Sequence, residues 1–113
     1  GLIQIALGIP IWTGSFDTLI KFHILDGLIF ACALITLAVL AAVARVQPGL
    51  VILAIIWVAV MVALGLTQQQ ILPDTAHWVV QIIHLLIGLG AIGLGETLAR
   101  RLHARLALQT VAR

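Results

Sequence analysis

Long runs of apolar residues, separated by short polar breaks, dominate the pattern along this chain. The runs cover residues 18–44, 50–66 and 76–98, and each is long enough for a helix that crosses a bilayer, which takes roughly 17 to 25 residues. Residues 1–12 are also apolar, but as a helix they span only about 18 Å. We expect them to be the end of a longer helix whose start lies outside this sequence. The pattern predicts an all-α integral membrane protein with a single domain, a four-helix transmembrane bundle.

Composition supports a membrane environment. Hydrophobic residues make up 63% of the chain and charged residues 9%, and a small soluble domain cannot bury so much apolar surface. We therefore expect the helices to contact the lipid bilayer. The net charge of +2 comes without a basic patch interleaved with aromatic residues, so no nucleic-acid partner is expected. A single cysteine, Cys32, excludes a disulfide framework and a cysteine-based metal site.

The breaks and the arginines predict the topology. Short breaks at residues 12–17, 45–49 and 67–74 force neighbouring helices to run antiparallel. The arginines lie in the second break and after the last run, which are on the same side of the membrane, and the positive-inside rule makes that side cytoplasmic. They are Arg45, Arg100, Arg101, Arg105 and Arg113. We expect a bacterial inner membrane protein whose residues 99–113 form a cytoplasmic tail.

Two short sequence patterns occur twice. The pattern H-[I/L]-L-x-G-L begins at His23 and again at His84, and the string ALG stands at residues 6–8 and 63–65. Each ALG precedes a break and then a helix that carries the histidine pattern. The first two helices and the last two are therefore predicted to be copies of one hairpin, and sites form where such copies meet.

The repeated histidine is the strongest chemical signal, because an ionisable residue is costly in hydrocarbon. The depths of His23 and His84 in the membrane should differ by only about 5 Å, so the two imidazoles could face each other and ligate the iron of a haem from opposite sides. Gly27 and Gly88 lie one turn deeper on the same helix faces, where they would leave room for the porphyrin. The alternative is that each histidine donates a hydrogen bond across helices and that the glycines, like Gly90, Gly93 and Gly95, serve close packing.

The quoted strings also carry a family resemblance. "LIQIALGIPIWTGS" followed by "HILDG", and "ALGL" followed by "HLLIG", resemble the helical hairpins of haem A synthase. The chain is similar, more loosely, to cytochrome b561-type four-helix membrane cytochromes. The resemblance implies that histidines on opposed helices, here His23 and His84, bind haem b. Because the chain has length for one such bundle, the resemblance implies electron transfer rather than conversion of haem.

Two further residues are secondary candidates for the site. His77 lies two turns from His84 toward the outer surface, where it could contact a haem propionate or could be an interfacial histidine beside Trp78. Asp26 stands one turn inside its helix, where a carboxylate is expensive. It could couple a proton to haem reduction or hold a partner subunit, or it could be bonded to Thr13, Ser15 or a loop glutamine.

Taken together, the sequence predicts a membrane-bound b-type cytochrome with one bis-histidyl haem b near the outer face. Two axial histidines leave the iron no open position, which favours electron transfer over catalysis by the chain on its own. The expected partner is another membrane redox subunit or a quinone, with the chain as a small subunit of a larger complex. The alternatives are a cofactor-free structural subunit of a respiratory or photosynthetic complex and a subunit that binds a chlorin pigment.

Overall fold

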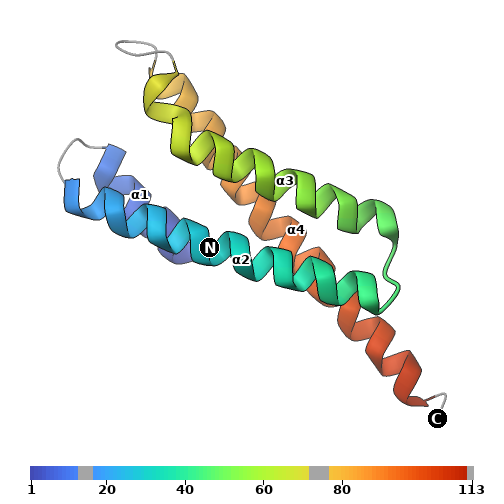
Figure 1. The fold of residues 1–113 in the computed structure, drawn as a ribbon. Coiled ribbons are helices and arrows are strands. Elements are labelled where there is room, and N and C mark those ends of the chain that lie inside the picture. Colours follow the sequence, from blue (N-terminus) through green and yellow to red (C-terminus); the bar gives the residue numbers. More distant parts are fainter. Residues whose placement is uncertain (13–16, 72–76, 112–113) are drawn as a thin grey trace.

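The computed structural model of the chain is all-helical in its described residues, which are 1–12, 17–71 and 77–111. The helices, in chain order, are α1 (Leu2–Trp12), α2 (Asp17–Val43), α3 (Pro48–Thr67), the short 3-10 helix η1 (Gln68–Gln70) and α4 (His77–Val111). Figure 1 shows two hairpins, α1 with α2 and α3 with α4, that pack against each other. Three of these helices, α2, α3 and α4, are long and apolar enough to cross a membrane, as the hydrophobic runs predict.

The helix boundaries follow the apolar runs closely for α2 and α3 but not for α4. The apolar pattern predicts a last helix that ends at residue 98 and a tail of residues 99–113, whereas α4 continues to Val111. Residues 99–111 contain no glycine or proline and are rich in Arg, Leu and Ala, all good helix formers. The helix therefore continues where the apolar run stops, because the loss of hydrophobicity marks a change of environment and not the end of the helical backbone.

The connection between α2 and α3 is a tight helix cap. Arg45 has a positive φ of 57°, and its N–H donates to the Ala42 carbonyl at 3.0 Å, while the Val46 N–H donates to the Ala41 carbonyl at 2.9 Å. This pair of hydrogen bonds is the Schellman motif that ends many helices. Pro48 then opens α3 at a position where its missing N–H costs nothing. The short cap holds α2 and α3 antiparallel and in contact.

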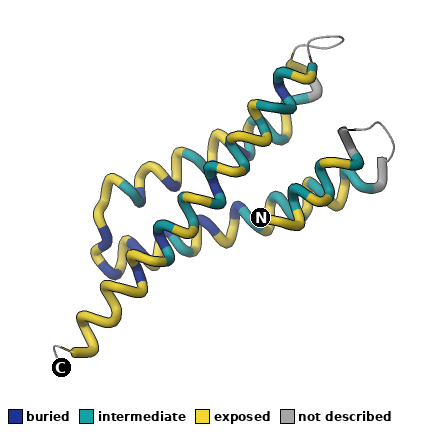
Figure 2. The backbone as a smooth tube through the Cα atoms, turned by 180° about the vertical axis from the view of Figure 1, so that it is seen from behind, coloured by how far each residue is buried: buried dark blue, intermediate teal, exposed yellow. Residues whose placement is uncertain are grey.

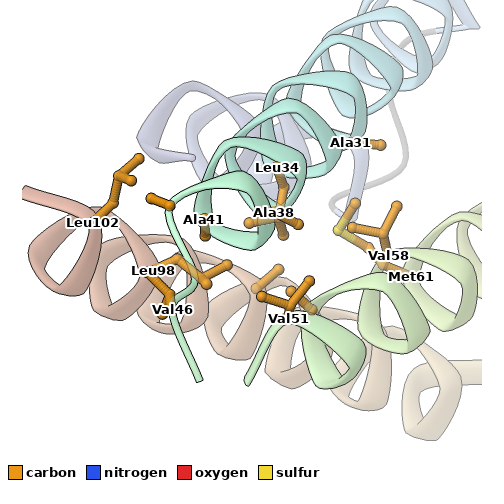
Figure 3. Close-up of a cluster of buried hydrophobic side chains, with 13 residues drawn as sticks. Ala31, Leu34, Ala38, Ala41, Val46, Val51, Val58, Met61, Leu98 and Leu102 are labelled. Carbon is orange, nitrogen blue, oxygen red and sulfur yellow. The ribbon is translucent and has the colours of Figure 1, made fainter. Parts of the chain in front are cut away.

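The core is a seam of small and medium apolar side chains between α2, α3 and α4 (Figure 3). On α2 and α3 the buried residues follow the 3-4-3 spacing of a coiled-coil seam, and the many alanines let the helix backbones approach closely. The buried residues of the two helices are Ala31, Leu34, Ala38 and Ala41, and Val51, Ala54, Val58 and Met61. On α4 the seam is completed by Ala91, Leu98 and Leu102.

This core fills only one half of the bundle, the half next to the connection between α2 and α3. In the other half, among the described side chains of residues 1–10, 19–30, 62–71 and 77–90, only Val80 is buried. Figure 2 shows the same asymmetry, and the two hairpins diverge toward the end where α1 stops and α4 begins. The bundle is therefore tightly packed at one end and loosely packed at the other.

The outside of the bundle is apolar on every long helix. Large side chains such as Phe22, Ile29, Ile56 and Leu86 are more than half exposed. An exposed apolar surface of this extent is not stable in water. It is compatible with contact with a lipid bilayer.

Candidate functional site

The structure brings the two repeated histidines together in the loosely packed half of the bundle. The ring centroids of His23 on α2 and His84 on α4 lie 6.0 Å apart, and the ring planes are inclined by 61°. One histidine comes from each hairpin, so the pair exists only because the hairpins pack against each other. The side-by-side placement agrees with the sequence prediction, and haem ligation by the pair stays a prediction.

A glycine of the neighbouring helix in the same hairpin stands against each imidazole. A Cβ atom built on Gly8 of α1 would lie 3.6 Å from Cε1 of His23, and one built on Gly65 of α3 would lie 3.3 Å from Cε1 of His84. Both glycines are the last residue of the repeated ALG string. The repeated string thus places a glycine beside each histidine ring. Gly65 makes room for its ring, whereas a Cβ at Gly8 would be in ordinary contact with its own.

Three polar atoms at the site are buried without a hydrogen-bond partner among the described residues. They are Nδ1 of His23, Nδ1 of His84 and Oδ2 of Asp26. Buried polar atoms in folded proteins are nearly always paired, so each orphan calls for an explanation such as a missing ion or ligand. For Asp26, two of the partners that the sequence offers, Thr13 and Ser15, lie outside the described residues.

Gly27 and Gly88, predicted to have the same role, have different surroundings. The side-chain amide of Gln4 on α1 donates to the backbone carbonyl of His23 at 2.9 Å, and a Cβ on Gly27 would stand 2.8 Å from that Gln4 nitrogen. In a helix the residue four positions on stands over a carbonyl, so Gly27 gives Gln4 access to it. Beside Gly88, by contrast, no heavy atom lies within 4 Å of the Cβ position. The space at the Cβ position is therefore open on the α4 side, and on the α2 side the flexible Gln4 side chain occupies it.

The remaining glycines of α4 separate into packing residues and open positions. Gly90 admits the Trp57 indole, which would collide with a Cβ there and which donates to the Ile87 carbonyl at 2.9 Å. Gly95 faces Leu34, with 3.4 Å between the Cβ position and Leu34 Cδ1. The packing interpretation is confirmed for these two glycines. Gly93 has no heavy atom within 4 Å, so close packing does not explain it.

The secondary candidates lie near the site without completing it. His77 is the first residue of α4 and is half-buried, two turns from His84, and no hydrogen bond joins it to another described residue. His103 is exposed on the last part of α4. Among the described residues, no group of three or more His, Cys, Asp or Glu side chains could hold a metal ion.

Comparison with known proteins identifies no relative. No protein-family model matches the chain, and no curated protein and no solved structure matches it. The support for a function therefore comes from the residues and their geometry.

Proposed function

We propose that the chain is an integral membrane b-type cytochrome, a four-helix transmembrane bundle that binds one haem b between His23 and His84 and transfers electrons through it. The observation that carries the proposal is the facing pair of imidazoles in the loosely packed half of the bundle. The ring nitrogens of a buried structural histidine are normally hydrogen-bonded, whereas here two histidines from two hairpins meet and each keeps an Nδ1 atom without a partner among the described residues.

The spacing of the rings would allow both imidazoles to hold one metal ion. With metal–nitrogen bonds of about 2 Å, two such imidazoles hold their ring centres roughly 6 Å apart. The centroids of His23 and His84 are 6.0 Å apart. A hydrogen bond between the two rings does not explain the contact, because the Nδ1 atoms of both histidines have no hydrogen-bond partner in the described part of the chain.

The loose packing of this half supports a bulky apolar ligand. Protein interiors are packed as densely as organic crystals, and the other half of this bundle has such a core. A porphyrin between the helices would fill the space around His23 and His84 with apolar surface, which the side chains there do not fill. Gly8 and Gly65 hold each imidazole close to its neighbouring helix, and the open position beside Gly88 lies one turn from its ligand.

The residues of the site then have distinct tasks. Haem, when bound, supplies one-electron redox chemistry. His23 and His84 would hold the haem, and a haem held by two histidines favours electron transfer over chemistry on a substrate. Gln4 fixes the backbone at His23 through the carbonyl of that residue. Asp26, one turn from His23, can hold a proton at its unpaired Oδ2 atom, which would offset the charge of an incoming electron.

A single haem near one membrane surface cannot carry electrons across the whole bilayer. Other membrane redox subunits or a quinone would have to deliver or accept the electron. The exposed apolar faces of α2 and α4 offer area for contacts with lipid and with such subunits, in keeping with a small subunit of a larger complex in the bacterial inner membrane.

The proposal is tested by the absorption spectrum of the purified protein and of three variants. The wild type should give the sharp α-band of reduced low-spin haem b. His23→Ala and His84→Ala should each lose the six-coordinate spectrum, because one axial ligand is removed. His103→Ala is the matched control, since His103 is exposed and remote from the pair, and its spectrum should not change.

Other outcomes would contradict the proposal in different ways. A wild-type spectrum without a haem band, after expression with sufficient haem, would favour the cofactor-free structural subunit. Absorption far to the red would indicate a chlorin pigment instead. A normal haem spectrum in both alanine variants would show that other residues bind the iron.

A further inference from the structure

A polar groove lies at the tightly packed end of the bundle, away from the histidines. It has a volume of about 490 Å³ and runs between the α2–α3 connection and the last part of α4. Its lining residues are Val46, Gln47, Arg101, Ala104, Arg105 and Leu108. The groove therefore combines two arginines and an amide with three apolar side chains.

The charge of these arginines is not neutralised within the described part of the chain. Arg101 donates from Nη1 to the neutral side-chain oxygen of Gln47 at 2.8 Å, and Arg105 makes no hydrogen bond to a described residue. The nearby acid, Glu96, forms its ion pair with Arg100 at 3.1 Å. Arg101 and Arg105 are four residues apart and share one face of α4, so they present two positive charges to the same groove.

The position of the groove places it at a membrane surface if α2, α3 and α4 cross the bilayer. The chain turns back between Val43, the last residue of α2, and Pro48, the first residue of α3. The hydrogen bond from Arg101 to Gln47 shows that Arg101 of α4 lies beside this turn. Beyond it α4 continues out of the bundle (Figure 1). At such a level the phosphates of lipid headgroups are the abundant anions, and basic pockets between helices attract them.

We propose that this groove binds the phosphate of an anionic phospholipid, with Arg101 and Arg105 as its ligands. Guanidinium groups match phosphate oxygens with paired hydrogen bonds. Gln47 holds the Arg101 side chain toward the groove, so that both guanidinium groups can reach one phosphate. The inference rests on membrane insertion and not on haem, so the two proposals can fail separately.

The experiment measures lipid binding to the purified full chain in phosphatidylcholine nanodiscs or detergent, with phosphatidylglycerol as the titrated probe and native mass spectrometry as the readout. Wild type should bind phosphatidylglycerol in preference to phosphatidylcholine. Arg105→Gln should weaken binding roughly fivefold, since one arginine near an anionic surface contributes that much, and adding Arg101→Gln should weaken it further. Arg105→Gln breaks no hydrogen bond between described residues, so loss of folding does not obscure its effect.

Arg100→Gln is the matched control, because it also removes one arginine from the last part of α4, but Arg100 pairs with Glu96 and does not line the groove. It should leave phosphatidylglycerol affinity within about twofold of wild type. An equal loss in the Arg100 and Arg105 variants would mean that only the net charge matters, and would overturn the site. Competition by inorganic phosphate at concentrations similar to those of the lipid would instead assign the groove to a free small anion.

Discussion

Two glycines of α4, Gly88 and Gly93, have open space where a side chain would stand, and only one of them lies close to a histidine. For both, no heavy atom comes within 4 Å of the Cβ position. Gly88 is one turn from His84, while Gly93 is about two and a half turns from it. The pair therefore forms a natural control, because each position tolerates a side chain in the protein itself.

This difference predicts the effect of a leucine at each position on haem content. Gly88→Leu should bind haem poorly, because added volume in a filled pocket costs about 1–3 kcal/mol. Gly93→Leu should keep its haem, since its side chain would enter the groove between α3 and α4 that Leu53, Trp57 and Thr97 help to line. The measurement is haem per folded protein. Equal haem content in the two variants would mean that no macrocycle lies beside Gly88.

At the scale of elements, the end of α2 has a backbone conformation that its residue does not favour. Arg45 has a φ of 57°, the left-handed region in which a side chain is strained and which glycine adopts freely. The hydrogen bonds of the cap, from Arg45 and Val46 to the end of α2, hold this conformation.

The cap predicts a stabilising substitution. Arg45→Gly should raise the free energy of unfolding by about 1 kcal/mol, as measured by thermal unfolding in detergent. Arg45→Ala removes the same charge but keeps a Cβ, so it should stay within about 0.5 kcal/mol of wild type. If the alanine variant gained as much stability as the glycine variant, relief of charge repulsion rather than relief of backbone strain would be the cause.

At the scale of the whole molecule, the two ends of the bundle differ in both packing and charge. The end with the dense core also has Arg45, Arg100, Arg101 and Arg105, and the loosely packed end has the histidine pair. If α2, α3 and α4 cross the membrane, the positive-inside rule predicts that the arginine-rich end faces the cytoplasm. The orientation of the chain therefore decides on which side of the membrane the proposed haem lies.

Cysteine labelling measures this orientation directly. Cys32 is exposed, so the test uses a Cys32→Ala background with a single new cysteine at Gln70, in η1, or at Gln109, near the end of α4; both positions are exposed. A membrane-impermeant maleimide added from outside should label the residue at position 70 and not the one at 109. Labelling in the reverse pattern would invert the orientation and move the haem to the cytoplasmic side.

The sequence alone determined the helical class and the positions of α2 and α3, because apolar runs of membrane-spanning length with short polar breaks leave few other arrangements. It also identified His23 and His84 as a pair, because an ionisable residue is energetically unfavourable in a membrane and its repetition in the same pattern indicates a common function. It placed the end of α4 too early, because the apolar pattern reports the environment while helix propensity decides the backbone.

Only the tertiary structure decided what surrounds each residue. In the sequence Gly27 and Gly88 have equivalent positions in the repeat. In the structure the Gln4 side chain of α1 occupies the space beside Gly27, whereas the space beside Gly88 is open. The sequence likewise gives no reason for Gly8 and Gly65 to meet imidazole rings, or for the core to fill one half of the bundle. These features depend on how the two hairpins approach each other, and that approach is set by contacts between side chains far apart in the chain.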